Sequence, residues 1–340
     1  MPVPLSLLDL SVLNAGQSTA DALATTTALA RRADELGYVR CWVAEHHNMP
    51  SVACTSPLVL VAHLAASTSR IRVGTGGVML PNHAPLVVAE QFAMLEALHP
   101  GRIDVGVGRA PGSDGATANA VRRGAGLGAD DFPRDLLDLM GLLGDVRLDD
   151  GLWNRFTATP APTTFPPVFL LGSSDYSARL AAHLGLPFAF AHHFDMAGND
   201  LRVTRNVAVL YRTNYQPSTH HPEPHLVVTA NVLAADTFDE AHWHAAPGRI
   251  TALGRRTGRF TPLPSAEEAA VHPDLAEAMR LPTARIVGDV ATVRTRLAEL
   301  AELTAADELM VACVAHDLSA RLRSLELTAA ACELTTSVPA

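Results

Sequence analysis

The chain has 340 residues, 48% of them hydrophobic, and 35 acidic residues outnumber 26 basic ones, all arginine, for a formal net charge of −9. Nucleic acids and anionic membranes bind positive patches, so neither is an expected partner. No apolar stretch approaches the roughly 18 residues of a membrane span, and the first residues carry Asp9 and no basic region, so we expect neither a membrane segment nor a signal peptide. The four cysteines lack C-x-x-C spacing, which predicts reduced thiols and a cytoplasmic protein.

Short apolar runs alternate with stretches of helical periodicity along the whole chain. The runs predict eight strands, at residues 5–13, 39–45, 71–79, 102–108, 167–172, 187–191, 225–234 and 308–315. Helical patterns lie between them at residues 19–37, 57–67, 85–101, 175–185, 197–215 and 289–303. Eight strands with helical crossovers are typical of a closed parallel barrel. We therefore predict an α/β fold, a (β/α)₈ TIM barrel, with residues 1–340 forming a single domain.

Three irregular stretches rich in Gly, Pro and Thr interrupt this alternation, at about 110–131, 148–166 and 243–284. In a barrel such insertions are usually loops around the mouth or hairpins beside it. The rival architecture, an open sheet that binds a dinucleotide, needs G-x-G-x-x-G after its first strand. The nearest match, Gly124 to Ala129, follows VRR instead of a strand, so the barrel is favoured.

The second predicted strand ends in Glu45-His46-His47, and barrel enzymes carry their reactive groups at such strand ends. A histidine there can accept or donate a proton near neutral pH, although either ring could instead bind a backbone carbonyl in the turn. A metal site is disfavoured, because H-E-x-x-H is absent and the sequence offers no third ligand. We predict no metal.

Thr75-Gly76-Gly77 interrupts a strand that otherwise consists of Val and Ile. Two glycines weaken a strand, so the backbone there needs a bulge or twist, close approach of a flat ligand, or an unusual peptide geometry. The residues alone leave these interpretations open.

Arg109 follows the fourth predicted strand, and Gly172-Ser173-Ser174 follows the fifth, just before a helix. A guanidinium beside glycine-rich backbone suits a phosphate, and a helix N-terminus with serine hydroxyls is an anion site. Simple capping by Ser174 is the alternative. Because the two strands are neighbours in a barrel, both groups can face one phosphate.

Three stretches together resemble the bacterial-luciferase-like, flavin-dependent monooxygenases: WVAEHHN, RVGTGGVMLPNHAPLVVAEQFAMLEALHPGRIDVGVGRAPGSD and LLGSSDYSARLAAHLGLPFAFA. The likeness covers most of residues 5–195, with a weaker echo in RIVGDVATVRTRLAEL. It is strongest to the subgroup that includes tailoring oxygenases of polyketide biosynthesis, which implies antibiotic biosynthesis and a polyketide-type substrate.

The resemblance implies a two-component oxygenase that receives reduced FMN from a separate NAD(P)H:flavin reductase. The flavin then forms a C4a-peroxide with O₂ and epoxidises or hydroxylates a small organic substrate. His46 matches the catalytic histidine, and Gly76 and Gly77 match a pair joined by a cis peptide beneath the flavin ring, next to Thr75. The phosphate-binding residues of the family match at Arg109, Gly172, Ser173, Ser174 and Ser177.

Two departures stand out. Gly108 replaces a cysteine of the luciferases and Ser173 replaces a carboxylate, so light emission is not implied. Residues 216–284 match no motif. The alternatives are an F420-dependent hydride-transferring enzyme of the same superfamily and a flavin-binding protein without turnover. A hydrolase is disfavoured, because the chain has no G-x-S-x-G.

The stretch 57–67 is more apolar than a solvated barrel helix requires, notably at Leu58, Val59, Val61, Ala62, Leu64 and Ala65. Coverage by a neighbouring loop would explain this equally well. Together with the family's habit of dimerising through barrel helices, the stretch predicts a homodimer.

Overall fold

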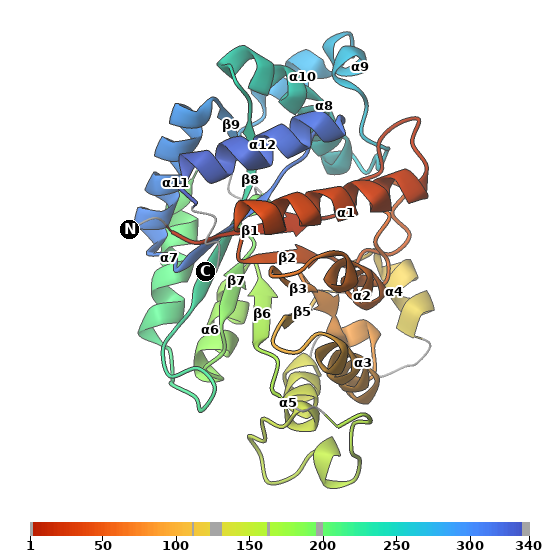
Figure 1. The fold of residues 1–340 in the computed structure, drawn as a ribbon, viewed down its shortest axis with the longest axis vertical. Coiled ribbons are helices and arrows are strands. Elements are labelled where there is room, and N and C mark those ends of the chain that lie inside the picture. Colours follow the sequence, from red (N-terminus) through yellow and green to blue (C-terminus); the bar gives the residue numbers. More distant parts are fainter. Residues whose placement is uncertain (1–2, 111, 123–130, 162–163, 195–199, 335–340) are drawn as a thin grey trace.

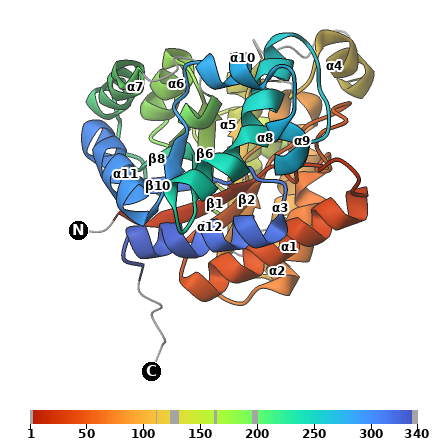
Figure 2. The same cartoon turned by 90° about the horizontal axis from the view of Figure 1, so that it is seen from above.

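The computed structural model describes residues 3–110, 112–122, 131–161, 164–194 and 200–334. Its centre is a closed barrel of eight parallel strand positions, surrounded by helices (Figures 1 and 2). In order around the barrel the strands are β1 (Leu5–Asp9), β2 (Arg40–Val43), β3 (Arg72–Thr75), β5 (Ile103–Gly108), β6 (Val168–Gly172), β7 (Phe188–Phe190), β8 (Leu226–Ala234) and β10 (Glu308–Ala312). β10 pairs with both β1 and β8, which closes the ring and confirms the predicted TIM barrel.

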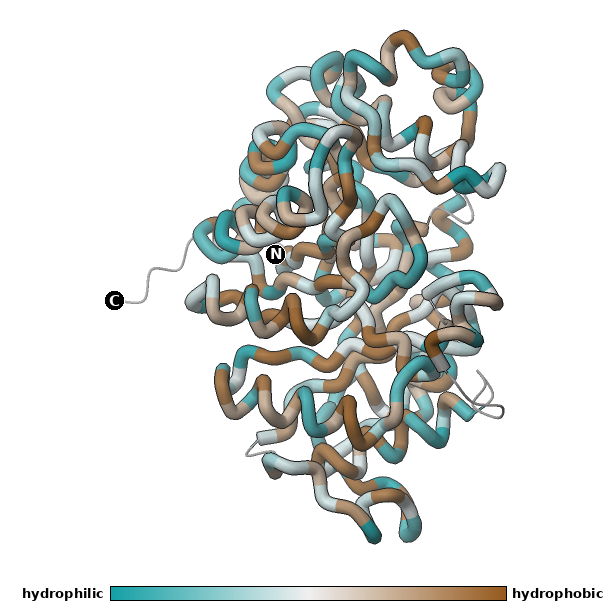
Figure 3. The backbone as a smooth tube through the Cα atoms, turned by 90° about the vertical axis from the view of Figure 1, so that its right-hand side faces the viewer, coloured by the Kyte–Doolittle hydropathy of each residue, from teal (hydrophilic) through white to brown (hydrophobic). Residues whose placement is uncertain are grey.

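The crossover helices cover the outside of the barrel. They are α1 (Thr19–Leu36), α2 (Pro57–Ser67), α3 (Pro85–Leu98), α5 (Phe132–Leu143), α6 (Asp175–His183), α7 (Leu201–Thr213), α8 (Phe238–Arg256), α11 (Val290–Thr304) and α12 (Leu318–Ala331). Hydrophobic and hydrophilic positions alternate along the outer helices, as expected when one face packs on the strands (Figure 3). None of the described helices is long and apolar enough to cross a bilayer.

Charged groups close the barrel interior at the end opposite the mouth. Arg40 lies between Asp104, 2.8 Å from its Nη1, and Glu308, 2.8 Å from its Nε. Above them an apolar layer contains Leu8, Trp42 and Phe169. Because these buried charges are paired, side chains fill this end of the barrel. A site for a ligand is therefore expected at the opposite end of the strands.

The third predicted strand differs from the expectation of one continuous run over 71–79. β3 stops at Thr75, and β4 (Val78–Met79) resumes beside β5, with a cis peptide bond between Gly76 and Gly77. The first predicted strand likewise stops early, at Asp9, and Ser11 has a positive φ of 49°. Both strands therefore leave the ladder at the mouth, where their following residues become available to a site.

The stretch 243–284, predicted as irregular, is largely helical. α8 runs on to Arg256 and is followed by α9 (Ala266–Ala270) and α10 (Leu275–Arg280), which lie together at the top of Figure 1. Pro247 and Gly248 conceal the helical pattern, but both are buried, so tertiary packing outweighs local propensity. An unpredicted short strand, β9 (Ile286–Gly288), then pairs with the end of β8.

The other two insertions also contain short helices. α4 (Gly115–Arg122) lies in the stretch 110–131, although residues 111 and 123–130 fall outside the described part. The stretch 148–166 contains the turn η2 (Leu152–Asn154). The ring of Trp153 from this turn packs against Gly141 of α5, where a Cβ would lie 2.0 Å from Trp153 Cε3. Packing therefore requires glycine at this position, although glycine inside a helix weakens the helical pattern of the sequence.

Candidate active site

A cavity at the carboxyl ends of the strands brings together eight of the nine predicted site residues. We call it the inner cavity; its wall includes His46, Gly76, Gly77, Arg109, Gly172, Ser173, Ser174 and Ser177. Thr75 is fully buried outside this wall, where its Oγ1 donates to the Gly106 carbonyl at 2.7 Å and accepts from the Gly106 amide at 3.1 Å. Thr75 therefore joins β3 to β5 and does not face the cavity.

One side of the inner cavity is bare backbone. A Cβ on Gly76 would lie 2.9 Å from Leu8 Cδ1, and a Cβ on Gly77 would lie 2.8 Å from the Gly106 oxygen. At Gly77 the close atom is backbone, so only glycine fits there without displacing β5, whereas at Gly76 a Cβ would displace the Leu8 side chain. The strand is thus interrupted where its backbone lines the cavity, and a flat ring can approach that surface without meeting side chains.

Another part of the cavity wall carries hydrogen-bond donors that have no acceptor among the described residues. Arg109 stacks over the ring of Tyr176 at 4.5 Å and makes no hydrogen bond or ion pair with the described residues. Ser174 is the N-cap of α6, but its hydroxyl makes no capping bond, and Ser177 is buried one turn later at 5% exposure. A guanidinium, free hydroxyls and the first amides of a helix together form a site for a dianion such as a phosphate.

Gly172 allows this site to be compact. A Cβ there would lie 2.3 Å from both Cβ and Oγ of Ser177, so the first turn of α6 can pack directly on the end of β6. β5 and β6 are paired neighbours, with Gly108 opposite Leu171. Arg109 and the serine turn therefore face one another as the sequence predicted.

The structure gives the three residues after β2 different roles. Glu45 is fully buried and binds Nε2 of His47 at 2.9 Å, Nε2 of His83 at 2.9 Å and the Met79 amide at 2.9 Å. Burial opposes ionisation, but these bonds, led by the one from His83, outweigh it and lower the pKa of Glu45. Glu45 and His47 therefore fix the loop, and only His46 enters the cavity.

The ring of His46 is oriented by a backbone carbonyl. Its Nδ1 lies 3.3 Å from the Gly112 oxygen, and because a carbonyl can only accept, Nδ1 carries the proton of the neutral ring and Nε2 keeps a lone pair. Burial lowers the pKa of His46 below its usual value, although the Gly112 bond and Glu45 oppose this, and the charge of Arg255 lowers it further. At neutral pH His46 can therefore accept a proton.

A second histidine, which the sequence reasoning missed, lies across the cavity. His193 Nδ1 is 2.5 Å from Thr229 Oγ1, and Asn231 Nδ2 donates to the His193 carbonyl at 2.7 Å. Burial, reinforced by neighbouring positive charge, lowers the pKa of His193 to about 3, so it stays neutral. The signal was present, because His192-His193 follows β7 as Glu45-His46-His47 follows β2.

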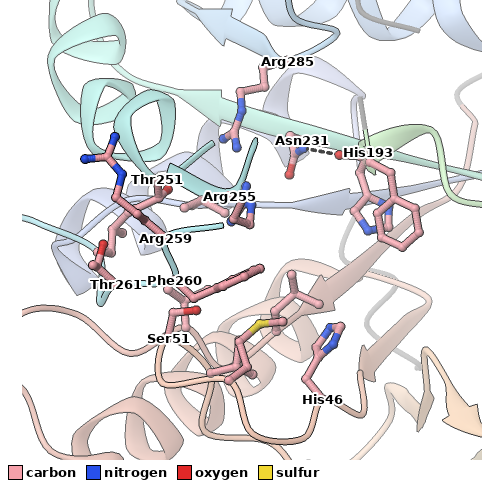
Figure 4. A pocket seen from close by; sticks show the side chains of 17 residues that line it. His46, Ser51, His193, Asn231, Thr251, Arg255, Arg259, Phe260, Thr261 and Arg285 are labelled. Atoms are coloured by element: carbon pink, nitrogen blue, oxygen red, sulfur yellow. Dashed lines mark hydrogen bonds between the residues drawn. The ribbon is translucent and has the colours of Figure 1, made fainter. Parts of the chain in front are cut away.

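A second cavity, the outer cavity, adjoins the first and shares His46, His193, Phe194 and Leu10 with it. Its other wall comes from the end of α8 and the residues after it, including Arg255, Arg259, Phe260 and Arg285 (Figure 4). Figure 4 shows these arginines on the side of the cavity away from His46. The two histidines thus stand at the junction between a glycine-lined space and an arginine-lined one.

Comparisons with known proteins are consistent with this geometry. The family model described as luciferase-like monooxygenase matches residues 4–307, and so includes the stretch 216–284 where no motif was found. A luciferase-like monooxygenase of Escherichia coli (strain K12) is 41% identical over 338 residues, 96% of each chain. The N-acetyl-S-alkylcysteine monooxygenase of Bacillus subtilis (strain 168) is 37% identical over 270 residues, 79% of each chain.

Solved structures agree. That of apo-MsnO8 has a TM-score of 0.88 at 37% identity and covers 98% of this chain and 99% of its own. The oxygenating constituent of 3,6-diketocamphane monooxygenase from Pseudomonas putida, in complex with FMN, shares the fold with a TM-score of 0.70 at 19% identity and 96% coverage of both chains.

The fold is a barrel whose cavity at the strand ends is lined by glycine backbone, by Arg109 and by the serines that begin α6. The chain belongs to the luciferase-like monooxygenase family and is a flavin-dependent monooxygenase.

Proposed function

We propose that the protein is the oxygenating component of a two-component system. The bound cofactor would be reduced FMN, supplied by a separate NAD(P)H:flavin reductase, and it would provide the two electrons that activate O₂, so that one oxygen atom enters a small organic substrate and the other leaves as water. The observation that carries this proposal is the set of unpartnered donors at the end of the inner cavity, Arg109 with Ser174 and Ser177, beyond a floor of bare glycine backbone.

The residues present fit FMN at both ends. Arg109, Ser173 and Ser174 would hold the 5′-phosphate, because these groups offer positive charge and free hydrogen-bond donors. Gly76 and Gly77 would lie against the flat ring. Most of the remaining wall is apolar, with Leu8, Trp42 and Met310, and would restrict water at the reacting end.

His46 would handle the proton of the reaction. Its Nε2 faces the cavity with a lone pair, and its lowered pKa keeps it neutral and able to accept at neutral pH. Glu45 acts only indirectly, by fixing the loop that presents His46.

The decisive experiment measures O₂ consumption by the purified protein with FMN, NADH and a flavin reductase, over the rate of the reductase alone. Binding of reduced FMN followed by substrate-dependent O₂ incorporation supports the proposal. Reduction of F420 by an added alcohol, without O₂ incorporation, would instead identify the hydride-transferring alternative. Flavin binding with neither activity would identify the protein as a carrier.

Partners and location complete the proposal. All four cysteines are unpaired, as expected for a reducing cytoplasm.

The outer faces of α2 and α3, which contact one another, expose Val59, Val87, Met94 and Leu98 to solvent, with Val59 at 73%. Val61, Leu64 and Ala65, by contrast, are buried in the chain's own core. The four exposed side chains form the surface through which we propose homodimerisation. A polyketide-type substrate stays a prediction.

A further inference from the structure

The outer cavity is positively charged, although the chain as a whole has a net charge of −9. Arg255, Arg259 and Arg285 line it, and none of the described lining residues is Asp or Glu. Charges interact more strongly in a partly enclosed space than in water. An anion that enters this space therefore meets positive lining side chains and, among the described lining residues, no carboxylate.

The three arginines are not equivalent. Arg259 is paired with Asp274, at 3.1 Å, and donates to Thr257. Arg285 is held beside α8, where a Cβ on Gly248 would lie 3.0 Å from its Nη1. Arg255 makes no hydrogen bond or ion pair within the described part of the chain, and its side chain is exposed to the cavity. Arg255 is therefore the cation available to a ligand.

The position of Arg255 at the end of a helix does not by itself explain why its charge lines the cavity. Arg255 and Arg256 both lie in the last turn of α8, where a cation interacts favourably with the helix dipole. Arg256 satisfies that preference from outside the cavity, whereas Arg255 lines it. The charge of Arg255 lowers the pKa of both His46 and His193. Its charge thus acts on the junction with the inner cavity.

Apolar side chains form a large part of the remaining wall of the outer cavity, among them Val12, Val52, Phe260 and Leu263. The polar side chains on this wall, Ser51, Asn231, Thr251 and Thr261, are uncharged. A ligand held by its charge at Arg255 would lay an apolar body along the apolar side chains and reach His46 with its far end. The volume, about 230 Å³, limits the ligand to a small molecule.

We propose that the outer cavity selects small organic anions with an apolar body, and that Arg255 binds the anionic group. The inference rests on the proposed function, because it takes this space to be the substrate site of the monooxygenase. A guanidinium pairs equally well with a carboxylate or a sulfonate, each of which offers two acceptor oxygens in one plane. Arg255 is then a specificity-determining residue that is remote from the reacting atoms.

The test measures binding to the flavin-free protein, so that it does not depend on oxygenase activity. Hexanoate, pentane-1-sulfonate and hexanamide share one pentyl chain; the first two are anions and the amide is neutral. Their dissociation constants are compared by calorimetry and ligand-observed NMR. We expect at least one of the two anions to bind at least tenfold more tightly than the amide. The anion that binds more tightly identifies the preferred head group.

Three variants then test whether Arg255 is the group that binds the anion. Arg255→Gln should abolish the preference for anions, while the matched control Arg256→Gln, one residue along the same helix, should keep it. Arg255→Lys keeps the charge and should retain most of the preference. Circular dichroism checks that each variant is folded, and if Arg255→Gln is not, the Lys variant and the ligand series still decide.

Three results would overturn the proposal. Equal binding of amide and anions to the wild-type protein would remove the charge selectivity, and equal losses in both Gln variants would remove Arg255 as its source. Weaker FMN binding in Arg255→Gln with unchanged hexanoate binding would assign the arginine to the cofactor. Failure of the proposed function is separate: it appears as absent O₂ incorporation and leaves anion binding unchanged.

Discussion

We expect turnover to depend most directly on His46. Its Nδ1 is oriented by the Gly112 carbonyl, so a side chain without an accepting Nε2 cannot replace it. We expect His46→Ala to keep FMN binding but to lower product formation by about 10²- to 10⁴-fold, the usual contribution of a positioned proton acceptor. Product is measured with reductase-supplied FMN. His183→Ala is the control, because His183 is exposed at the end of α6 and lines neither cavity. Full turnover by His46→Ala would remove the assignment.

The pH dependence of turnover follows from the lowered pKa of His46. The neutral ring is the active form, so activity should be constant above the pKa and fall as the pH drops through it, with the acid limb below pH 6.5. Because the charge of Arg255 contributes to this lowering, Arg255→Gln should move the acid limb to higher pH. The profile of kcat against pH tests both statements, and an acid limb above pH 6.5 in the wild type would contradict the role of His46.

Arg109 should discriminate between flavins. It has no protein partner among the described residues, so its loss leaves no buried acid unpaired and removes only a ligand contact. We expect Arg109→Ala to weaken FMN binding by at least tenfold and riboflavin binding by less than twofold. Fluorescence titration with both flavins measures this, and equal losses for the two ligands would show that Arg109 does not contact the phosphate.

At the scale of elements, the contact between β3 and β5 decides whether the floor of the inner cavity forms. A Cβ on Gly106 would lie 1.8 Å from the Thr75 oxygen, a backbone atom that cannot move without shifting the strand. Gly106→Ala should therefore lower the free energy of unfolding by more than about 3 kcal/mol, or prevent folding. Gly115→Ala is the control, because a Cβ there meets nothing within 4 Å and the change should stay below about 1 kcal/mol. Urea unfolding compares the two, and similar midpoints would show that β3 and β5 can separate at no cost.

Elements also show what sequence reasoning could and could not reach. The eight barrel strands, six of the crossover helices and the interruption at Gly76 and Gly77 follow from local patterns. The helices α5, α8 and α12 were not predicted. Ser174 lies at the cavity, as its strand-end position indicates, and its role at an anion site stays a prediction. Arg255 had no such signal, because an arginine near a helix end is common, and its position at the mouth depends on how α8 packs on β8 and β9. The hydrogen bond between Glu45 and the Met79 amide also could not be predicted, because it joins residues 34 positions apart and depends on the fold of the barrel.

At the scale of the whole molecule, the exposed apolar side chains of α2 and α3 predict the assembly. A dimer of two 36.0 kDa chains would have a mass of about 72 kDa, which light scattering after gel filtration can measure. Val59→Glu combined with Met94→Glu should convert it to a monomer, because both side chains are exposed and a charge would be buried at the interface. Arg31→Glu, on the surface of α1, serves as a charge-changing control. A wild-type monomer at micromolar concentration would refute the proposed interface.

The two cavities are built from different lengths of chain. The inner one draws on strand ends distributed from β1 to β10, whereas the arginine wall of the outer one comes from a single excursion between β8 and α11. Point changes in that excursion alter what is admitted and leave the glycine floor and the phosphate end in place. Gene duplication followed by drift in one continuous segment could thus generate oxygenases with new substrates from this chain, without rebuilding the machinery that activates oxygen.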